Sequence, residues 1–294
     1  MRVKLLLAFF CLSILLLPSV FSASSVVEMK LEASLSESDI GIIAGDVSPN
    51  GESVLLVGKD GYAREISALE AEDRSRDIEL VTGRNVDLQD TSWHPRGQAA
   101  LIAGDLGVAL RYETYDNSIT LVNGTGTIIG HNLTTVEWRQ AGDYAYFGAD
   151  DGGVWKFAEG IGFVALDDTR NSSITGISCH RNIDSCVMST LQDGLAVIGP
   201  THNLTWLSGT SSHTWVDVDC AEPILNECLG FASGLRTGII KINSVDATKS
   251  SAKTPVQYTT LEGDFTKISR GHDSTSLIIL APFSTVRQYP VDDD

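Results

Sequence analysis

The segment WHPRGQAALIAGDLG, from Trp93 to Gly107, shows the pattern on which most of this sequence is built. The same pattern recurs without gaps from Val47 to Gly61 and from Trp138 to Gly152. Each copy has a glycine at an early turn, a second glycine ten residues later, and an apolar or aromatic residue five positions beyond that. Internal repetition of this kind indicates an architecture made of one repeated unit.

Looser copies continue the repeat towards the C-terminus. Cys179 and Cys220 take the place of the tryptophan, and Ser269 begins the last copy, so that successive copies start 41–49 residues apart. That length is typical of a four-stranded propeller blade. The apolar second segment of each copy, such as 100–103, predicts a strand buried on both faces. We therefore predict an all-β fold, a β-propeller of about six blades with four antiparallel strands per blade.

The two ends of the chain predict how the ring closes. The last copy supplies only three strands, near Phe265–Ser269, Leu277–Leu280 and Val286–Tyr289. The segment Val26–Leu31 precedes the first copy, alternates apolar and charged residues, and has no partner within its own repeat. We expect this N-terminal strand to complete the last blade, because that pairing hides an exposed sheet edge.

The first residues predict export. Arg2 and Lys4 precede an apolar run from Leu5 to Leu17, and small residues up to Ser22 follow. This is the pattern of a secretory signal peptide. The run is short for a bilayer span, which needs about 20 residues; an uncleaved membrane anchor is the alternative. We expect a signal peptide over residues 1–22, a single propeller domain over 23–294, and a location that is secreted or on the extracellular face of the cell envelope.

The excess of acidic residues limits the classes of molecule that can bind this protein. The formal net charge is −17, with 38 acidic against 21 basic residues. Such a field repels a phosphate backbone, so nucleic acid is excluded as a partner. An acidic surface serves solubility, or attracts cations or basic partners.

The cysteines predict disulfides. One of the five, Cys11, lies in the signal segment, and the other four form two pairs that each bracket a hairpin turn. Facing residues on antiparallel strands are close enough for a disulfide, and an exported chain meets oxidising surroundings. We predict the bonds Cys179–Cys186 and Cys220–Cys228. Zinc would require closer cysteine pairs or histidines at ligand spacing, and no metal is expected.

Four sequons predict N-glycosylation in a host that has the machinery. Each is an asparagine followed two residues later by serine or threonine, and the acceptors are Asn123, Asn132, Asn171 and Asn203.

The repeat resembles a known group. The residues Trp-His-Pro-Arg-Gly, Ala-Leu-Ile-Ala-Gly-Asp-Leu-Gly and Leu-Arg-Tyr between Trp93 and Tyr112 look like WD-repeat-like and photosystem-assembly-factor-like propeller repeats. The resemblance covers nearly all of the mature chain and is clearest in the first three blades. It implies the propeller fold and commonly a protein-binding or scaffolding role. It implies no catalytic residues, and the Trp-Asp ending of typical eukaryotic WD repeats is absent.

Two sets of residues are candidates for a binding surface. The first is a set of carboxylates at the turns between second and third strands, which a propeller gathers on one face: Asp60, Asp105, Asp150, Asp151 and Asp193. They either bind a cation or basic partner, or serve as good turn residues. The second is a set of tryptophans near the end of the innermost strands, which either pack in the core or form an aromatic rim: Trp93, Trp138 and Trp215.

No recognisable catalytic motif or cofactor-binding motif is present, so no catalytic residue and no cofactor are assigned. The leading hypothesis is a secreted or cell-surface propeller that acts as a non-catalytic module for a protein partner. A glycan-acting hydrolase or lyase, a lectin-like glycan binder and a cell-envelope assembly factor are the alternatives, so an enzymatic role stays open. Contact with a membrane is expected only if the signal segment is uncleaved.

Overall fold

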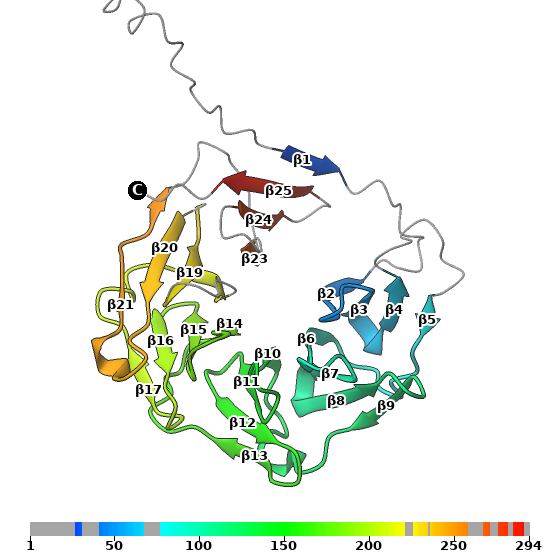
Figure 1. Ribbon diagram of the computed structural model, residues 1–294. Helices are drawn as coiled ribbons and strands as arrows, with labels where there is room; N and C mark the ends of the chain where they lie inside the picture. The colour runs from blue at the N-terminus through cyan, green and yellow to red at the C-terminus, as the bar shows by residue number, and fades with distance from the viewer. Residues whose placement is uncertain are drawn as a thin grey trace, which may run out of the picture.

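The computed structural model describes residues 27–30, 41–67, 77–220, 226–234, 236–257, 267–270, 276–281 and 285–290. The predicted signal segment lies outside these residues. The described chain forms six antiparallel sheets arranged in a ring (Figure 1). It contains no α-helix, and none of its helical turns is long and apolar enough to cross a membrane.

Each sheet is one blade of the propeller, numbered here in chain order. Blade 1 contains β2 (Ile42–Val47), β3 (Ser53–Gly58), β4 (Ala63–Ser67) and β5 (Ile78–Glu79). Blade 2 contains β6 (Leu88–Trp93), β7 (Ala99–Gly104), β8 (Val108–Glu113) and β9 (Ser118–Leu121). Blade 3 contains β10 (Leu133–Trp138), β11 (Ala145–Ala149), β12 (Val154–Ala158) and β13 (Gly162–Ala165).

The remaining blades follow the same order with one variation. Blade 4 contains β14 (Ile174–Cys179), β15 (Cys186–Thr190), β16 (Leu195–Ile198) and β17 (Leu204–Trp206). Blade 5 contains β18 (Trp215–Asp219), β19 (Glu227–Ala232) and β20 (Arg236–Lys241), and two short strands pair with β20, namely β21 (Ser251–Ala252) and β22 (Val256–Gln257). Blade 6 contains β23 (Lys267–Arg270), β24 (Ser276–Ala281), β25 (Thr285–Pro290) and β1 (Val27–Lys30).

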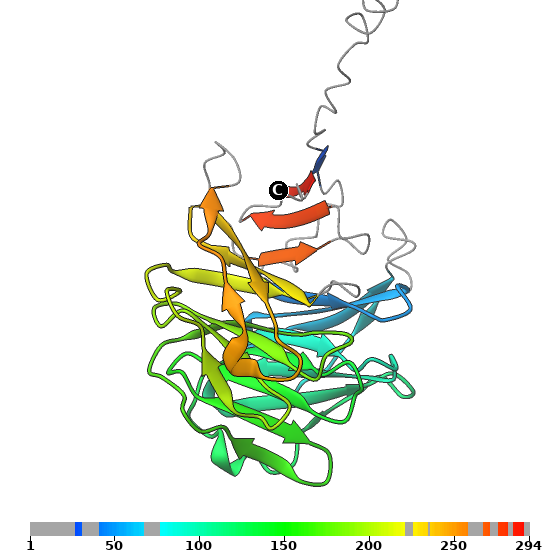
Figure 2. The same ribbon diagram turned by 60° about the vertical axis from the view of Figure 1, so that its left-hand side comes forward.

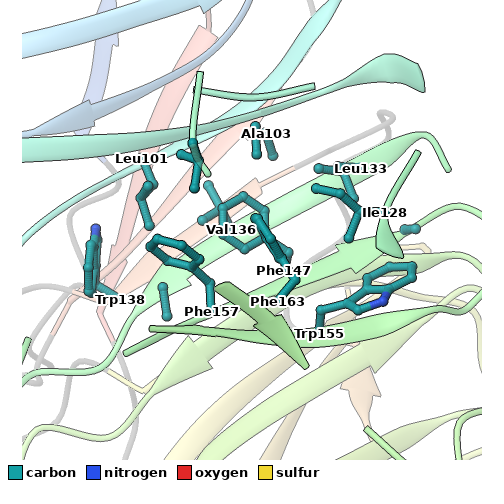
Figure 3. Packing of buried hydrophobic residues seen from close by; sticks show 14 residues of the cluster. Leu101, Ala103, Ile128, Leu133, Val136, Trp138, Phe147, Trp155, Phe157 and Phe163 are labelled. Carbon is teal, nitrogen blue, oxygen red and sulfur yellow. The ribbon is translucent and has the colours of Figure 1, made fainter. Parts of the chain in front are cut away.

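The apolar second strands form the middle of the core, as predicted. Every residue of β7, β11 and β15 is buried, because both faces of the strand lie against neighbouring blades. Figure 3 shows one such layer between blades 2 and 3, where Leu101 of β7 lies near Trp138 and Phe157 of blade 3. The rings of Phe147 and Phe157 meet edge to face at 6.3 Å.

The second glycine of the repeat is required by a close approach between loops. Gly107 follows β7 with φ +76°. A Cβ atom at this position would lie 2.1 Å from the carbonyl oxygen of Ile128 in the loop that leads to blade 3. Gly152 occupies the same place one blade later, where a Cβ atom would lie 1.7 Å from the carbonyl oxygen of Arg170. The repeat therefore preserves a site where backbone touches backbone.

Neighbouring blades are also joined by a recurrent hydrogen bond between their innermost strands. The next-to-last residue of one inner strand accepts a hydrogen bond on its side-chain oxygen. The donor is the backbone N–H of the residue that ends the inner strand of the following blade or immediately follows it. We call this bond the inner-strand clasp. It joins Asp46 to Trp93 at 2.8 Å, Ser92 to Trp138 at 3.1 Å, Glu137 to Cys179 at 3.4 Å and Ser178 to Cys220 at 3.0 Å.

Both predicted disulfides are formed. Cys179–Cys186 joins β14 to β15 in blade 4, and Cys220–Cys228 joins the end of β18 to β19 in blade 5. Cys179 lies directly opposite Cys186 in the ladder, just as Trp93 lies opposite Ala100 in blade 2. The disulfide-bonded cysteines therefore occupy the positions of the inner hairpin that Trp93 and Ala100 occupy in blade 2.

The N-terminal strand closes the last blade, which confirms the expectation from the sequence. Strand β1 pairs antiparallel with β25 over four residue pairs, from Val27 opposite Gln288 to Lys30 opposite Thr285. The two strands lie side by side in both views (Figures 1 and 2). Because β1 precedes blade 1 and pairs within blade 6, the backbone itself joins the two ends of the ring.

This closure gives a first testable prediction. Replacing Val27–Lys30 by a glycine–serine segment of equal length removes the partner of β25 and leaves an open sheet edge in blade 6. We expect a lower Tm and faster proteolysis that begins in the C-terminal blade, both measured on the purified chain. An unchanged Tm together with an unchanged cleavage pattern would contradict closure by β1.

Candidate partner-binding face

The predicted aspartates lie at one end of the ring. Asp60, Asp105, the pair Asp150 and Asp151, and Asp193 occupy the turns between the second and third strands of blades 1 to 4. Antiparallel order places these turns at the end of the ring where the loops between blades also run. We call this end the turn face, made of the turns 59–61, 105–107, 150–153 and 191–194 and the loops 80–87, 122–132, 166–173 and 207–214.

The carboxylates of the turn face make hydrogen bonds to residues of their own blade or of the loop that leads to it. Asp105 accepts a hydrogen bond from Gln89 Nε2 at 2.9 Å, and Asp150 accepts one from Asn132 Nδ2 at 2.9 Å. Such contacts are the turn chemistry that the sequence left open as one interpretation. Among the described residues, no three histidine, cysteine, aspartate or glutamate side chains are placed to hold a metal ion.

One of these carboxylates has a perturbed pKa. Burial raises the pKa of Asp151, but the hydrogen bond from the Gly153 N–H and the contact with His131 outweigh burial and lower it. His131 Nδ1 lies 2.6 Å from Asp151 Oδ2. Within the described chain, the carboxylates of Asp60, Asp105 and Asp150 form no ion pair. The aspartates of the turn face outnumber its basic residues Lys59, Arg84 and Arg170, so the face carries net negative charge.

Exposed apolar side chains lie between these carboxylates. Leu106 is 62% exposed and Ile129 is 69% exposed, and their loops touch where Gly130 N–H donates to the Leu106 carbonyl at 3.3 Å. We call this pair the apolar patch. It lies on the turn face between blades 2 and 3, next to Asp105.

Leu106 is an unusual residue for its backbone conformation. Its φ is +58°, in the left-handed region that leucine rarely adopts. Asp60 occupies the equivalent turn position in blade 1 with φ +56°, and aspartate tolerates that conformation better. Local structure therefore does not explain a leucine here, and an exposed apolar residue held in a costly conformation points to a role in binding.

The three tryptophans pack in the core, which is one of the two interpretations that the sequence left open, and they form no aromatic rim. Trp93, Trp138 and Trp215 are all at least 95% buried. Their rings insert between blades, where burial of large apolar surface outweighs any gain from exposure at the rim. The indole N–H of Trp93 donates to the Asp46 carbonyl at 2.9 Å, and that of Trp215 donates to the Thr210 carbonyl at 2.8 Å.

Three carboxylates on the inner strands were not among the candidate residues predicted from the sequence. Asp46, Asp90 and Glu137 come from blades 1, 2 and 3 and are close enough to influence one another electrostatically. Burial, followed by the charge of Asp90, raises the pKa of Asp46 to about 6 against the hydrogen bonds that it accepts. Burial and then the charge of Asp46 raise the pKa of Glu137 well above its usual range.

Asp46 and Glu137 predict how stability depends on pH. Both have a folded-state pKa above the unfolded value, so folding favours their protonated forms. Their contribution to stability is present below about pH 4 and is lost as the pH rises, for Asp46 through about pH 6. Glu137→Gln removes one charge, and its amide oxygen still accepts from the Cys179 N–H.

We therefore expect Glu137→Gln to raise stability at pH 7 by about 1–2 kcal/mol, the usual scale for relieving a poorly compensated buried polar group. The gain should shrink as the pH falls towards 4. Thermal unfolding of variant and wild type across this pH range measures it, with the exposed Glu52→Gln as control. A loss of stability at pH 7, or a gain that does not vary with pH, would show that folding does not disfavour the ionised form of Glu137.

A second polar cluster lies at the end of the ring opposite the turn face. His202 Nδ1 lies 2.7 Å from the Tyr146 hydroxyl and His202 Nε2 lies 3.0 Å from Lys156 Nζ. Tyr144 donates to Asp184 at 2.8 Å, and Arg139 pairs with the same carboxylate. Burial and then the charge of Lys156 lower the pKa of His202. These contacts join blades 3 and 4 and satisfy both ring nitrogens, so we assign the cluster a structural role.

Comparison with known proteins supports the fold. Neither a protein family model nor a curated protein matches this sequence. Among solved structures, the chain is similar to a chain of a mitotic checkpoint complex, with 12% identity, a TM-score of 0.71, and coverage of 92% of this chain and 88% of that one. It is also similar to the Cps50 (Swd1) β-propeller domain of Myceliophteria thermophila, with 9% identity, a TM-score of 0.65, and coverage of 88% and 83%.

A third structure, of the RRP9 WD40 repeats, has 10% identity and a TM-score of 0.55, and the match covers 92% of this chain and 98% of that one. At these identities the likeness concerns the fold alone. In fold, this protein is a β-propeller, similar to the propeller domains of these structures.

Proposed function

We propose that this protein is an exported, non-catalytic propeller that binds a protein partner through its turn face. The observation that carries the proposal is the apolar patch, Leu106 and Ile129, exposed between the aspartates of the turn face. Exposed apolar residues inside a polar rim are typical of protein interaction sites. The fold adds support, because one similar chain is part of a mitotic checkpoint complex.

The chemistry of the turn face selects the partner. Apolar side chains flanked by aspartates fit a segment that presents apolar residues beside lysine or arginine. The net charge of −17 would speed the approach of such a basic segment and repel acidic competitors. A role in assembling a cell-envelope complex, as the resemblance to photosystem-assembly-factor-like repeats suggests, is one setting in which such a partner would be met.

Export is supported by the N-terminal pattern and by the disulfides. Residues 1–22 have the organisation of a signal peptide. Two disulfides in neighbouring blades suit an oxidising compartment and are rare in reducing ones. We infer that the mature propeller acts outside the cytoplasm, secreted or at the outer side of the cell envelope.

The proposal is tested by affinity capture of the tagged mature protein from its own envelope and medium. We compare wild type with a charge-neutralised variant, Asp105→Asn with Asp150→Asn. A stoichiometric protein partner is expected, with capture that weakens in the variant and at high salt. Capture of glycan without any protein would favour a lectin-like role instead. Retention of the chain in the cytoplasm with its first 22 residues intact would contradict export.

A further inference from the structure

A pocket of about 550 Å³ lies at the edge of the ring between blades 2 and 3. Its walls come from β8 and β9 of blade 2 and from the turn between β12 and β13 of blade 3. Arg111 joins the two blades at this point, because it forms ion pairs with Glu113 of its own blade and with Glu159 of the next. The pocket shares only residues 122–124 with the turn face, and it does not include the apolar patch or the inner-strand carboxylates.

The lining of the pocket combines apolar and polar groups. Leu121 and Ile161 contribute apolar side chains that are 44% and 72% exposed. Arg111, Glu159 and Thr120 contribute hydrogen-bonding groups beside them. Apolar walls with a few polar groups are the usual surroundings of a small organic ligand. A sugar ring offers both an apolar face and hydroxyl groups, so it matches this lining.

One sequon lies at this pocket. Asn123, the acceptor of Asn-Gly-Thr, is exposed and is itself part of the lining. The next residue, Gly124, has φ +83°, and a Cβ atom there would lie 3.1 Å from the Cα atom of Gly162. The close approach of the two glycines holds the sequon against blade 3. A sugar attached to Asn123 would therefore begin at the edge of the pocket.

We propose that Asn123 carries an N-linked glycan and that the first N-acetylhexosamine units of this glycan occupy the pocket between blades 2 and 3. The glycan covers Leu121 and Ile161 and makes hydrogen bonds with the polar groups around Arg111. This inference rests on the proposed export, since N-glycosylation occurs on exported chains.

Two other sequons serve as internal controls. Asn171 and Asn203 are also exposed, but neither contributes to this pocket. Asn132 is a poor control, because its side chain accepts from the Leu106 N–H at 3.1 Å and donates to Asp150 at 2.9 Å in the turn face.

The experiment expresses the full chain through a eukaryotic secretory pathway and maps each sequon by glycopeptide mass spectrometry. The folded protein is then treated with a peptide N-glycosidase, and release is timed at each site. We expect release at Asn123 to be about fivefold slower than at Asn171 and Asn203, because only the undocked fraction is cleaved. Ile161→Ser, a change at an exposed wall, should accelerate release at Asn123 alone.

Each outcome decides the inference. An Asn123 glycan released as fast as those at Asn171 and Asn203 would overturn docking in the pocket. An empty Asn123 in a secreted chain, whether or not the other sequons are occupied, would overturn the inference and leave the proposed function standing. A chain that is not exported would contradict the proposed function as well, and cleavage of the signal peptide reports this separately.

Discussion

Replacing Leu106 and Ile129 together by asparagine is expected to weaken binding of the protein partner about a hundredfold, since two central apolar contacts each contribute about 1–2 kcal/mol. We expect the Tm of the folded protein to be unchanged. Both side chains are mostly exposed, and asparagine tolerates the left-handed conformation at position 106 better than leucine does. Affinity is measured with purified partner, and Tm is measured alongside.

A matched control is available at the other end of the ring. Tyr115 is 81% exposed in the turn between β8 and β9, away from the turn face. Tyr115→Asn removes a larger exposed side chain and should leave affinity unchanged. If this control weakens binding as much as the double variant does, the partner does not bind through the turn face.

The largest loss of stability is expected for Trp215→Ala. Trp215 is fully buried, and its ring lies against two glycines of blade 5. A Cβ atom at Gly230 would lie 2.6 Å from that ring, and one at Gly238 would lie 3.0 Å from it. Removing the ring leaves a cavity that neither glycine can fill. We expect a loss of about 3–5 kcal/mol, or a Tm lower by about 6–20 °C.

Trp206 provides the comparison for this prediction. It is partly exposed in β17, where Arg170 lies over its ring at 4.0 Å. We expect Trp206→Ala to cost about 1 kcal/mol, because it removes a surface contact without opening a core cavity. Equal losses from the two variants, measured by chemical denaturation, would contradict the core position of Trp215.

The fold could be predicted from the sequence because its repeat is local. The glycines at 107 and 152 recur in register, and each blade is a unit of consecutive strands. Closure by β1 also followed from local evidence, since one strand was left over at one end and one was missing at the other. The disulfides were predictable because each pair brackets its own hairpin.

The candidate site was less predictable because it depends on contacts between blades. Asp46 and Glu137 are separated by two repeats, and only the ring brings their charges together. The inner-strand clasp has a weak sequence signal, an acceptor just before the tryptophan or cysteine, as in Ser92 and Ser178. Leu106 lies at a position where blades 1, 3 and 4 have aspartate, and only the structure shows that it is exposed with a positive φ.

Site-specific photocrosslinking tests whether the turn face binds a protein. A photoreactive residue is placed at position 106 on the turn face, or at position 115 on the opposite end, in the mature protein within its own cell envelope. We predict one dominant protein crosslink from position 106 and none from position 115. Crosslinks from position 115 that equal those from position 106, or none from either, would contradict binding at the turn face.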